Sequence, residues 1–158
     1  MRLTVLELAL FAAAAAIAAS VLVRCSPAER AAVVVASWTR TPGALNPTVT
    51  QSTIGTTICR HGWTRTVRPP VSYTNDLKPR QLREYGLRGP PSGFQEDHLI
   101  SLELGGDPRD PRNLWPEPYP RASDVDRVEN DLNHSVCTGS LTLAEAQRRE
   151  SSLKHTRG

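Results

Sequence analysis

The sequence predicts a small α+β domain, and three observations lead to that class. Two short apolar segments, residues 94–99 and 113–115, flank a loop with a Gly-Gly turn at 105–106, as expected for two short strands joined by a loop. Apolar residues between 125 and 136 recur at intervals of three and four, which is typical of an amphipathic helix. Thirteen prolines, ten glycines and only 5% aromatic residues indicate a loop-rich core, and 158 residues allow one domain.

Residues 1–37 are expected to form a targeting segment rather than part of the domain. A basic residue precedes an apolar run at 8–19, which resembles the hydrophobic region of a secretory signal peptide. Residues 3–23 are also long enough to span a bilayer as an uncleaved anchor. We therefore predict a signal peptide or membrane anchor, a domain at 38–150 and a flexible polar tail at 151–158. The expected location is secreted, periplasmic or in the cell envelope.

Cysteine usage agrees with export. Besides Cys25 in the leading segment, the chain has only Cys59 and Cys137, which lie far apart in the sequence. In an oxidising compartment these two would most simply pair, and closing so long a loop stabilises the folded state by about 4 kcal/mol. The alternative is two unrelated buried thiols. A structural zinc site is not indicated, because neither cysteine has a second one nearby.

The part of the chain before the first strand is expected to be extended and then helical. Residues 39–47 are a lead-in rich in Pro, Gly and Asn, and residues 48–67, rich in Thr, Val and Ile, predict short strands or extended structure. A helix is predicted from Thr74 to about Tyr85, with Gly86 as its stop.

Two helices are expected after the strands. Prolines within residues 116–120 predict an irregular connection. Ser123, with an acidic residue three positions later, is then a candidate N-cap for a helix that ends at Cys137. The last helix is predicted to begin at Thr142, again with an acidic capping partner, and to end near Arg149.

Residues 94–118 concentrate the chemistry. The pair Asp97-His98 closes the first apolar segment, and Asn113 opens the second. Asp97 can bind a hard divalent cation through oxygen, and a neutral His98 can take a proton from water near neutral pH. Asn113 can fix the intervening loop by side-chain hydrogen bonds to the backbone. These residues in this order indicate a one-metal phosphodiesterase.

The ordered set EDHLISLELGG, NLWPEP and a later Val-Cys with an Ala-Gln helix resembles the HNH, or ββα-metal, nuclease motif. It is closer still to small exported bacterial proteins of that signature, over residues 41–148. The resemblance implies a small ββα-metal core with extra helices, Asp97 as a metal ligand, and His98 and Asn113 as the catalytic pair. In those relatives a hydrophobic end follows the Ala-Gln helix, whereas residues 151–158 here are polar.

The third motif residue is not fixed by the pattern. The resemblance implies a His or Asn about nine residues after Asn113, where this chain has Ala-Ser, and the prolines nearby indicate an insertion that moves the ligand further along. Our order of preference is Asn133, then Asp126, then His134, with helix capping as the alternative role of Asp126. A thin oxygen-rich ligand set favours Mg²⁺, with Mn²⁺ as the alternative, over zinc.

Charge is unevenly distributed along the chain. Residues 59–88 hold seven basic and two acidic residues, whereas residues 117–131 hold five acidic and two basic ones. A basic surface beside an acidic pocket suits a polyanion and a metal, although ordinary solvated faces explain the asymmetry equally well. The candidate phosphate contacts are Lys78, Arg80, Arg83, Arg109 and Arg112.

The predicted function is an exported, metal-dependent endonuclease that cuts DNA, or RNA, with little sequence preference. It would bind the nucleic-acid backbone, use no small-molecule cofactor and touch a membrane only through an N-terminal anchor. The alternative is a non-catalytic envelope protein that keeps the scaffold as a binding or structural module. A zinc hydrolase of another type is disfavoured, because no second histidine stands at ligand spacing from His98.

Overall fold

The computed structural model describes residues 33–157, apart from the side chains of Pro120 and Ser123. Most of the predicted leading segment, residues 1–32, therefore lies outside the described residues. Within the described part of the chain, no helix is long and apolar enough to cross a membrane.

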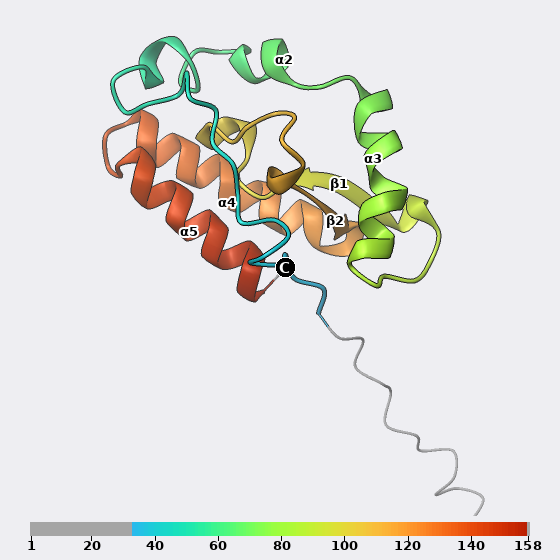
Figure 1. Ribbon diagram of the computed structural model, residues 1–158. Coiled ribbons are helices and arrows are strands. Elements are labelled where there is room, and N and C mark those ends of the chain that lie inside the picture. Colours follow the sequence, from blue (N-terminus) through green and yellow to red (C-terminus); the bar gives the residue numbers. More distant parts are fainter. Residues whose placement is uncertain (1–32, 158) are drawn as a thin grey trace, which may run out of the picture. The chain divides into compact units, whose positions relative to one another are not determined.

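Two short antiparallel strands form the centre of the domain, and helices pack around them (Figure 1). β1 spans Phe94–His98 and β2 spans Leu114–Pro118, with His98 opposite Leu114 and Phe94 opposite Pro118. The combination of a two-stranded sheet with several helices confirms the α+β class.

The helices of the described chain are α2 (Trp63–Val67), α3 (Val71–Glu84), α4 (Tyr119–Cys137) and α5 (Leu143–Thr156). Short 3-10 turns lie at Ile54–Thr56, Pro91–Gly93, Leu102–Leu104 and Pro111–Asn113. α3 contacts both strands, and α4 and α5 lie side by side, with α4 against the strands (Figure 1).

β2 runs through two of the prolines that we expected to prevent regular structure, so that prediction is wrong. The Leu99 N–H donates to the Asn113 carbonyl, just beyond the paired ends of the strands. From this pair onward, opposite residues of β1 and β2 alternate between pairs that exchange backbone hydrogen bonds and pairs that do not. Pro116 and Pro118 occupy the non-exchanging pairs, where an N–H would point away from β1. Proline therefore removes no bond from this ladder.

α4 begins at Tyr119, immediately after β2, rather than after an irregular connection. Pro120 lies in its first turn, where backbone N–H groups have no acceptor within the helix, so the missing N–H of proline costs no hydrogen bond. Ser123, the predicted N-cap, is inside the helix, so Asp126 is not its capping partner. The helix follows the strand directly.

α3 also begins earlier than predicted, at Val71 instead of Thr74. Pro70 is its extended N-cap residue, so the proline pair that ends the preceding segment also starts the helix. The end agrees with the prediction: Tyr85 caps the helix, and Gly86 follows with a φ of 66°, which suits glycine.

Residues 48–67 form turns and a short helix, not the predicted strands. Their threonines bond to nearby carbonyls: the Thr53 hydroxyl donates to Thr48, and the Thr57 hydroxyl donates to Thr53. Such local bonds offer the backbone an alternative to a strand ladder, which explains why β-branched composition misled us here.

α5 begins as predicted but extends further. The Thr142 hydroxyl accepts from the Glu145 N–H at 3.2 Å, which is the expected cap. The helix then continues to Thr156, with Lys154 and His155 only 0% and 4% exposed. The prediction of a flexible tail is therefore wrong for residues 151–156, because these polar side chains find buried partners elsewhere in the fold.

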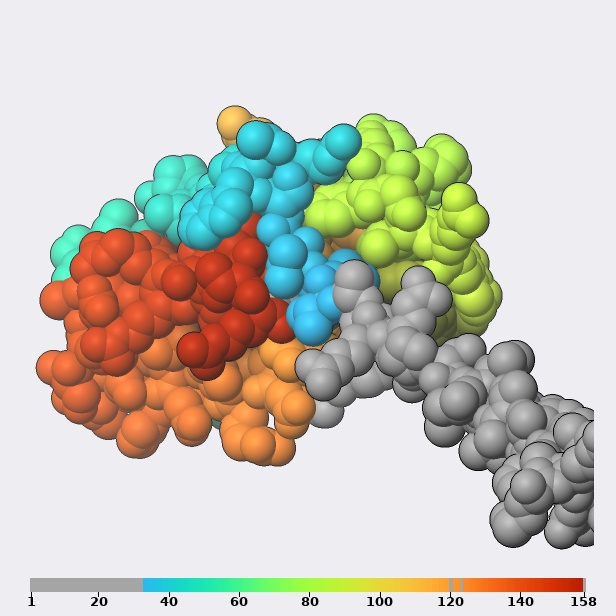
Figure 2. Space-filling model, turned by 90° about the horizontal axis from the view of Figure 1, so that it is seen from below, coloured from blue at the N-terminus to red at the C-terminus, as the bar shows by residue number. Residues whose placement is uncertain are grey.

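The first described residues belong to the domain rather than to a leader. Ala36 is buried against Leu99 and Trp115, and its N–H donates to the Lys154 carbonyl. The Ser37 N–H donates to the Tyr85 hydroxyl. Figure 2 shows this blue segment lying between α5 (red) and α3 (yellow-green). The boundary predicted at residue 37 is thus too late.

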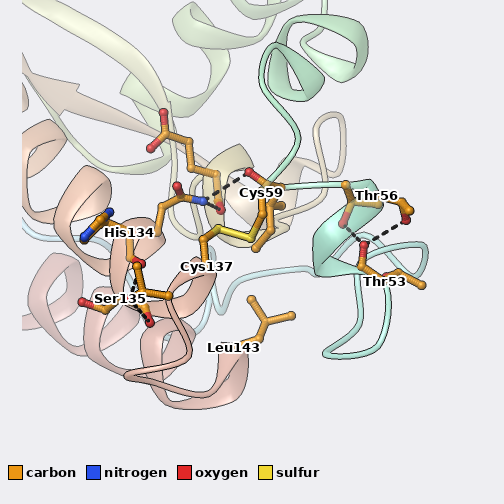
Figure 3. The surroundings of a disulfide bond; sticks show 12 residues. Thr53, Thr56, Cys59, His134, Ser135, Cys137 and Leu143 are labelled. Atoms are coloured by element: carbon orange, nitrogen blue, oxygen red, sulfur yellow. Dashed lines mark hydrogen bonds between the residues drawn. A yellow bond between two sulfur atoms is a disulfide. The ribbon is translucent and has the colours of Figure 1, made fainter.

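The predicted disulfide between Cys59 and Cys137 is present, with Cα atoms 5.5 Å apart and a sequence separation of 78 residues (Figure 3). It joins the segment before α2 to the last residue of α4. Ile58 and Val136, the residues next to the two cysteines, belong to the larger hydrophobic core.

Candidate functional site

Asp97 and His98 lie together at the end of β1, where the sequence analysis placed the chemistry. Successive strand residues point to opposite faces, so the two side chains meet different surroundings. The Asp97 side chain is 14% exposed, and His98 is 6% exposed. Both are largely shielded from water, so their neighbours decide their charge states.

Asn113 fixes the loop between the strands, as predicted. Its Oδ1 accepts from the Ile100 N–H at 2.9 Å, and its Nδ2 donates to the carbonyls of Ile100 and Asp107, each at 3.0 Å. A Cβ at Gly106 would lie 1.8 Å from the Ile100 carbonyl oxygen, so this loop admits only glycine there. These contacts make Asn113 a positioning residue for the loop that follows His98.

His98 is held as a neutral base. Its Nε2 lies 3.2 Å from the Pro108 carbonyl, which can only accept, so Nε2 carries the proton and Nδ1 is left as an acceptor. Burial lowers the pKa of His98; the charges of Lys154 and Arg68 lower it further, while Asp97 opposes them. The imidazole is thus able to take a proton near neutral pH.

On the inner side of Asp97, carboxylates converge on one ammonium group. Lys154 Nζ lies 2.9 Å from Asp97 Oδ2 and 2.6 Å from Glu129 Oε1, and it also donates to the His98 carbonyl. Glu150 Oε1 lies 3.5 Å away. The Lys154 side chain is fully buried, so it is the cation that joins β1, α4 and α5 at this point.

The carboxyl groups around Lys154 differ in their protonation states. Burial by itself raises the pKa of Asp97, but Lys154 outweighs it and lowers that pKa to about 2. Burial and the charge of Asp97 raise the pKa of Glu117 to about 8, and burial also raises the pKa of Glu129 and Glu150. Near neutral pH, Asp97 is therefore ionised, and a protonated Glu117 donates a hydrogen bond to it.

On the outer side, Asp126 interacts electrostatically with Asp97, Arg68 interacts with His98, and Glu103 interacts with both Asp126 and Arg68. Partial burial and the charge of Asp97 raise the pKa of Asp126, and burial and the charge of Asp126 raise that of Glu103. Arg68, between α2 and α3, lowers the pKa of both carboxyls and of His98. Asp126 and Arg68 are exposed, so this side is open to a ligand from solvent.

The first-choice third ligand, Asn133, has a structural role in the fold. Asn133 Nδ2 donates to the Glu103 carbonyl at 2.8 Å and to the Ile58 carbonyl at 3.4 Å, so the amide holds two loops. His134 is exposed further along α4. Of the three predicted candidates, Asp126 is the one whose carboxyl interacts electrostatically with Asp97.

Three of the five predicted phosphate contacts have partners within the protein, and four are exposed. Lys78 donates to the Phe94 carbonyl at 2.9 Å and supports β1. Arg80 pairs with Glu84 at 3.5 Å, and Arg112 pairs with Asp110. The exposed members of the set are Arg80, Arg83, Arg109 and Arg112.

Sequence reasoning missed most of the ion cluster and the arginine beside the site. One signal was available in α5, where Leu143 and Ala146 begin a buried stripe whose next positions, at helical spacing, are Glu150 and Lys154. The residues that were not predicted for the site are Arg68, Glu103, Glu117, Glu129, Glu150 and Lys154.

Comparisons of the chain with protein-family models, with curated proteins and with solved structures find no match. Among residues 33–157, no group of three or more His, Cys, Asp or Glu side chains is arranged to hold a metal ion. The HNH resemblance and the metal are therefore expectations that rest on the motif and on the local chemistry.

Proposed function

We propose that this chain is an HNH-type endonuclease that hydrolyses phosphodiester bonds in DNA or RNA with little sequence preference. The observation that carries the proposal is a neutral, buried His98 beside an ionised Asp97 at the end of β1, with Arg68 and Asp126 on the open side. A base, an anion that can hold a cation and a phosphate-binding guanidinium are the groups that this hydrolysis needs.

His98 acts as the general base in this proposal. Its Nδ1 takes a proton from a water molecule, whose oxygen attacks phosphorus as the ester oxygen leaves. Pro108 keeps the proton on Nε2 and so fixes the useful tautomer. Asn113 holds the loop that carries Pro108, which links the loop's hydrogen bonds to the orientation of the base.

A divalent cation fits the open side of Asp97 as a weakly held ion. Asp97 Oδ2 is bound by Lys154, whereas Oδ1 accepts from the Gln95 amide at 3.3 Å. Asp97 also raises the pKa of Asp126, so a cation near both carboxyls relieves their repulsion. Asp97 and Asp126 would hold Mg²⁺, or Mn²⁺, with several waters. When bound, the ion would polarise the phosphate and stabilise the leaving oxygen.

Export is part of the same proposal. The Cys59–Cys137 disulfide is stable in oxidising compartments, which agrees with a secreted, periplasmic or envelope location. In this proposal the exposed arginines Arg80, Arg83, Arg109 and Arg112 bind backbone phosphates without reading bases.

The test is plasmid nicking by the purified full-length chain with Mg²⁺, Mn²⁺ or EDTA. Metal-dependent nicking should be lost in His98→Ala. Asp126→Asn should raise the Mg²⁺ concentration needed, whereas Asp124→Asn, an exposed α4 residue paired with Arg127, should not. Nicking that survives His98→Ala would remove the assigned base, and equal effects of both Asp variants would remove the assigned ligand.

The second candidate is a non-catalytic envelope protein that keeps this scaffold as a binding or structural module. Lys154 favours it, because an internal ammonium already neutralises Asp97. A folded, oxidised protein that nicks with neither metal would support this candidate over the nuclease.

A further inference from the structure

A polar cleft of about 390 Å³ lies between α4 and the segment before α2. Arg60 and His61 line one wall, and Asn130 and His134 of α4 line the other, with Glu103 also in the lining. Its volume lies in the range of about 300–1,000 Å³ that is common for small-ligand sites.

The two walls of this cleft are held at a fixed separation. The Cys59–Cys137 disulfide ties one to the other (Figure 3). The Asn133 amide, also in the lining, donates to the carbonyls of Ile58 and Glu103. A cleft that is fixed by a covalent bond and two hydrogen bonds does not have to be ordered when a ligand enters.

The cleft and the candidate catalytic site are linked through Glu103 and through α4. Glu103 belongs to both, since it lines the cleft and responds to the charges of Arg68 and Asp126. Asn130, one turn after Asp126 on α4, donates to the Asp126 carbonyl. A chain whose phosphate lies at His98 can therefore extend along α4 into the cleft.

The lining offers the groups that recognise an unpaired nucleotide. Imidazole rings present flat faces on which bases stack, and a guanidinium binds phosphate. Amide and carboxyl groups can bond to the edge of a base. A base in a duplex is stacked and paired, so it cannot enter a site of this size.

We propose that this cleft binds a nucleotide of a single-stranded or unpaired segment that flanks the bond cut at His98. The proposal rests on the proposed function and narrows its substrate class. Arg60 binds phosphate, and His61 and His134 stack against the base.

The test is fluorescence anisotropy of the full-length chain with a short labelled single-stranded oligodeoxynucleotide and with a hairpin duplex of matched composition. EDTA prevents cutting during the measurement. His61→Ala/His134→Ala should weaken single-strand binding about tenfold, in line with the contribution of one stacked base, and leave duplex binding within about twofold. Both histidines are exposed, so the fold should be retained.

Arg60→Ala should also weaken single-strand binding, and Arg127→Ala is its charge-matched control on the exposed face of α4. The proposal that the cleft binds a nucleotide would be wrong if the double histidine variant kept its single-strand affinity, or if Arg60→Ala and Arg127→Ala lowered that affinity equally. Nicking is read separately. If the wild type nicks and the double variant binds single strands normally, the cleft proposal alone is wrong. If the wild type does not nick but the double variant loses single-strand binding, the cleft proposal is supported and the catalytic proposal is wrong.

Discussion

Two buried polar centres meet at the end of β1, and they are built in opposite ways. Asn113 is neutral, is fully buried and bonds to loop residues 6 and 13 positions away. Lys154 is charged, is equally buried and reaches Asp97 and Glu129, 57 and 25 positions away. One centre shapes a local loop, and the other joins three elements that are distant in sequence.

This difference teaches what each centre depends on. The bonds of Asn113 involve no ionisable group, so they hold at any pH at which the domain is folded. The cluster around Lys154 depends on which carboxyls carry protons. Buried ion pairs add little net stability compared with apolar packing, yet removing one partner leaves an uncompensated charge. The charged centre is therefore the more sensitive one.

The largest effect should follow from removing the ammonium group. Lys154→Ala should lower the free energy of unfolding by about 3–5 kcal/mol, because Asp97 then stays buried without its counter-ion. Urea denaturation measures the change, and Arg157→Ala, exposed at the end of α5, is the control. A loss below about 1 kcal/mol would mean that the cluster contributes no net ion pairing.

Next in size is the neutral centre. Asn113→Ala leaves the Ile100 N–H without its acceptor and two carbonyls without their donor, and it should lower stability by about 2 kcal/mol. Its loss should be the same at pH 5 and pH 8, unlike that of Lys154→Ala, in urea titrations at about those pH values. A pH-dependent loss for Asn113→Ala would break the contrast between the two centres.

A smaller effect concerns pH. The pKa of Glu117 is raised from 4.5 to about 8, so between these values the folded state holds a proton that the unfolded state has lost. Stability should therefore fall as pH rises through that window. Glu117→Gln keeps a donor toward Asp97 and removes the titrating group. At the alkaline end of the window, its free energy of unfolding should therefore exceed that of the wild type by on the order of 1 kcal/mol.

Thermal unfolding across this window measures the Glu117→Gln effect, with the exposed Glu84→Gln as control. Parallel profiles for wild type and Glu117→Gln would exclude Glu117 as the source. At the acid end the sign reverses: the pKa of Asp97 is lowered from 3.8 to about 2, so its contribution is lost as pH falls through that range.

The smallest effect belongs to a surface pair. Arg112 bonds to Asp110 but is exposed, so Arg112→Ala should leave the free energy of unfolding almost unchanged. If Arg112 contacts phosphate, the same variant should reduce the salt dependence of nucleic-acid binding by about one counter-ion. An unchanged salt slope would leave Arg112 as a solubility residue.

The parts of the fold that the sequence predicted are those that local chemistry decides. The Thr142 cap and the Gly86 stop depend on residues a few positions away, and the hydrogen bonds of Asn113 stay within the one loop that it closes. The disulfide followed from having two cysteines left to pair.

The parts that were missed depend on tertiary partners. The end of α5 looked like a soluble tail, because the carboxyls that bury Lys154 come from β1 and α4. The prolines of β2 looked disruptive, because only the strand register shows that they fall at pairs that exchange no bonds. For the same reason the electrostatic interaction of Arg68 with His98 could not be predicted from spacing alone.

The disulfide has a consequence for resistance to proteolysis. Asp97, His98, Asn113 and Asp126 all lie between Cys59 and Cys137, within one covalently closed loop. A protease that cuts one peptide bond in that loop leaves two fragments that remain joined, and the packed core can keep them in register. The exposed loops around the site can therefore be nicked without releasing any part of it.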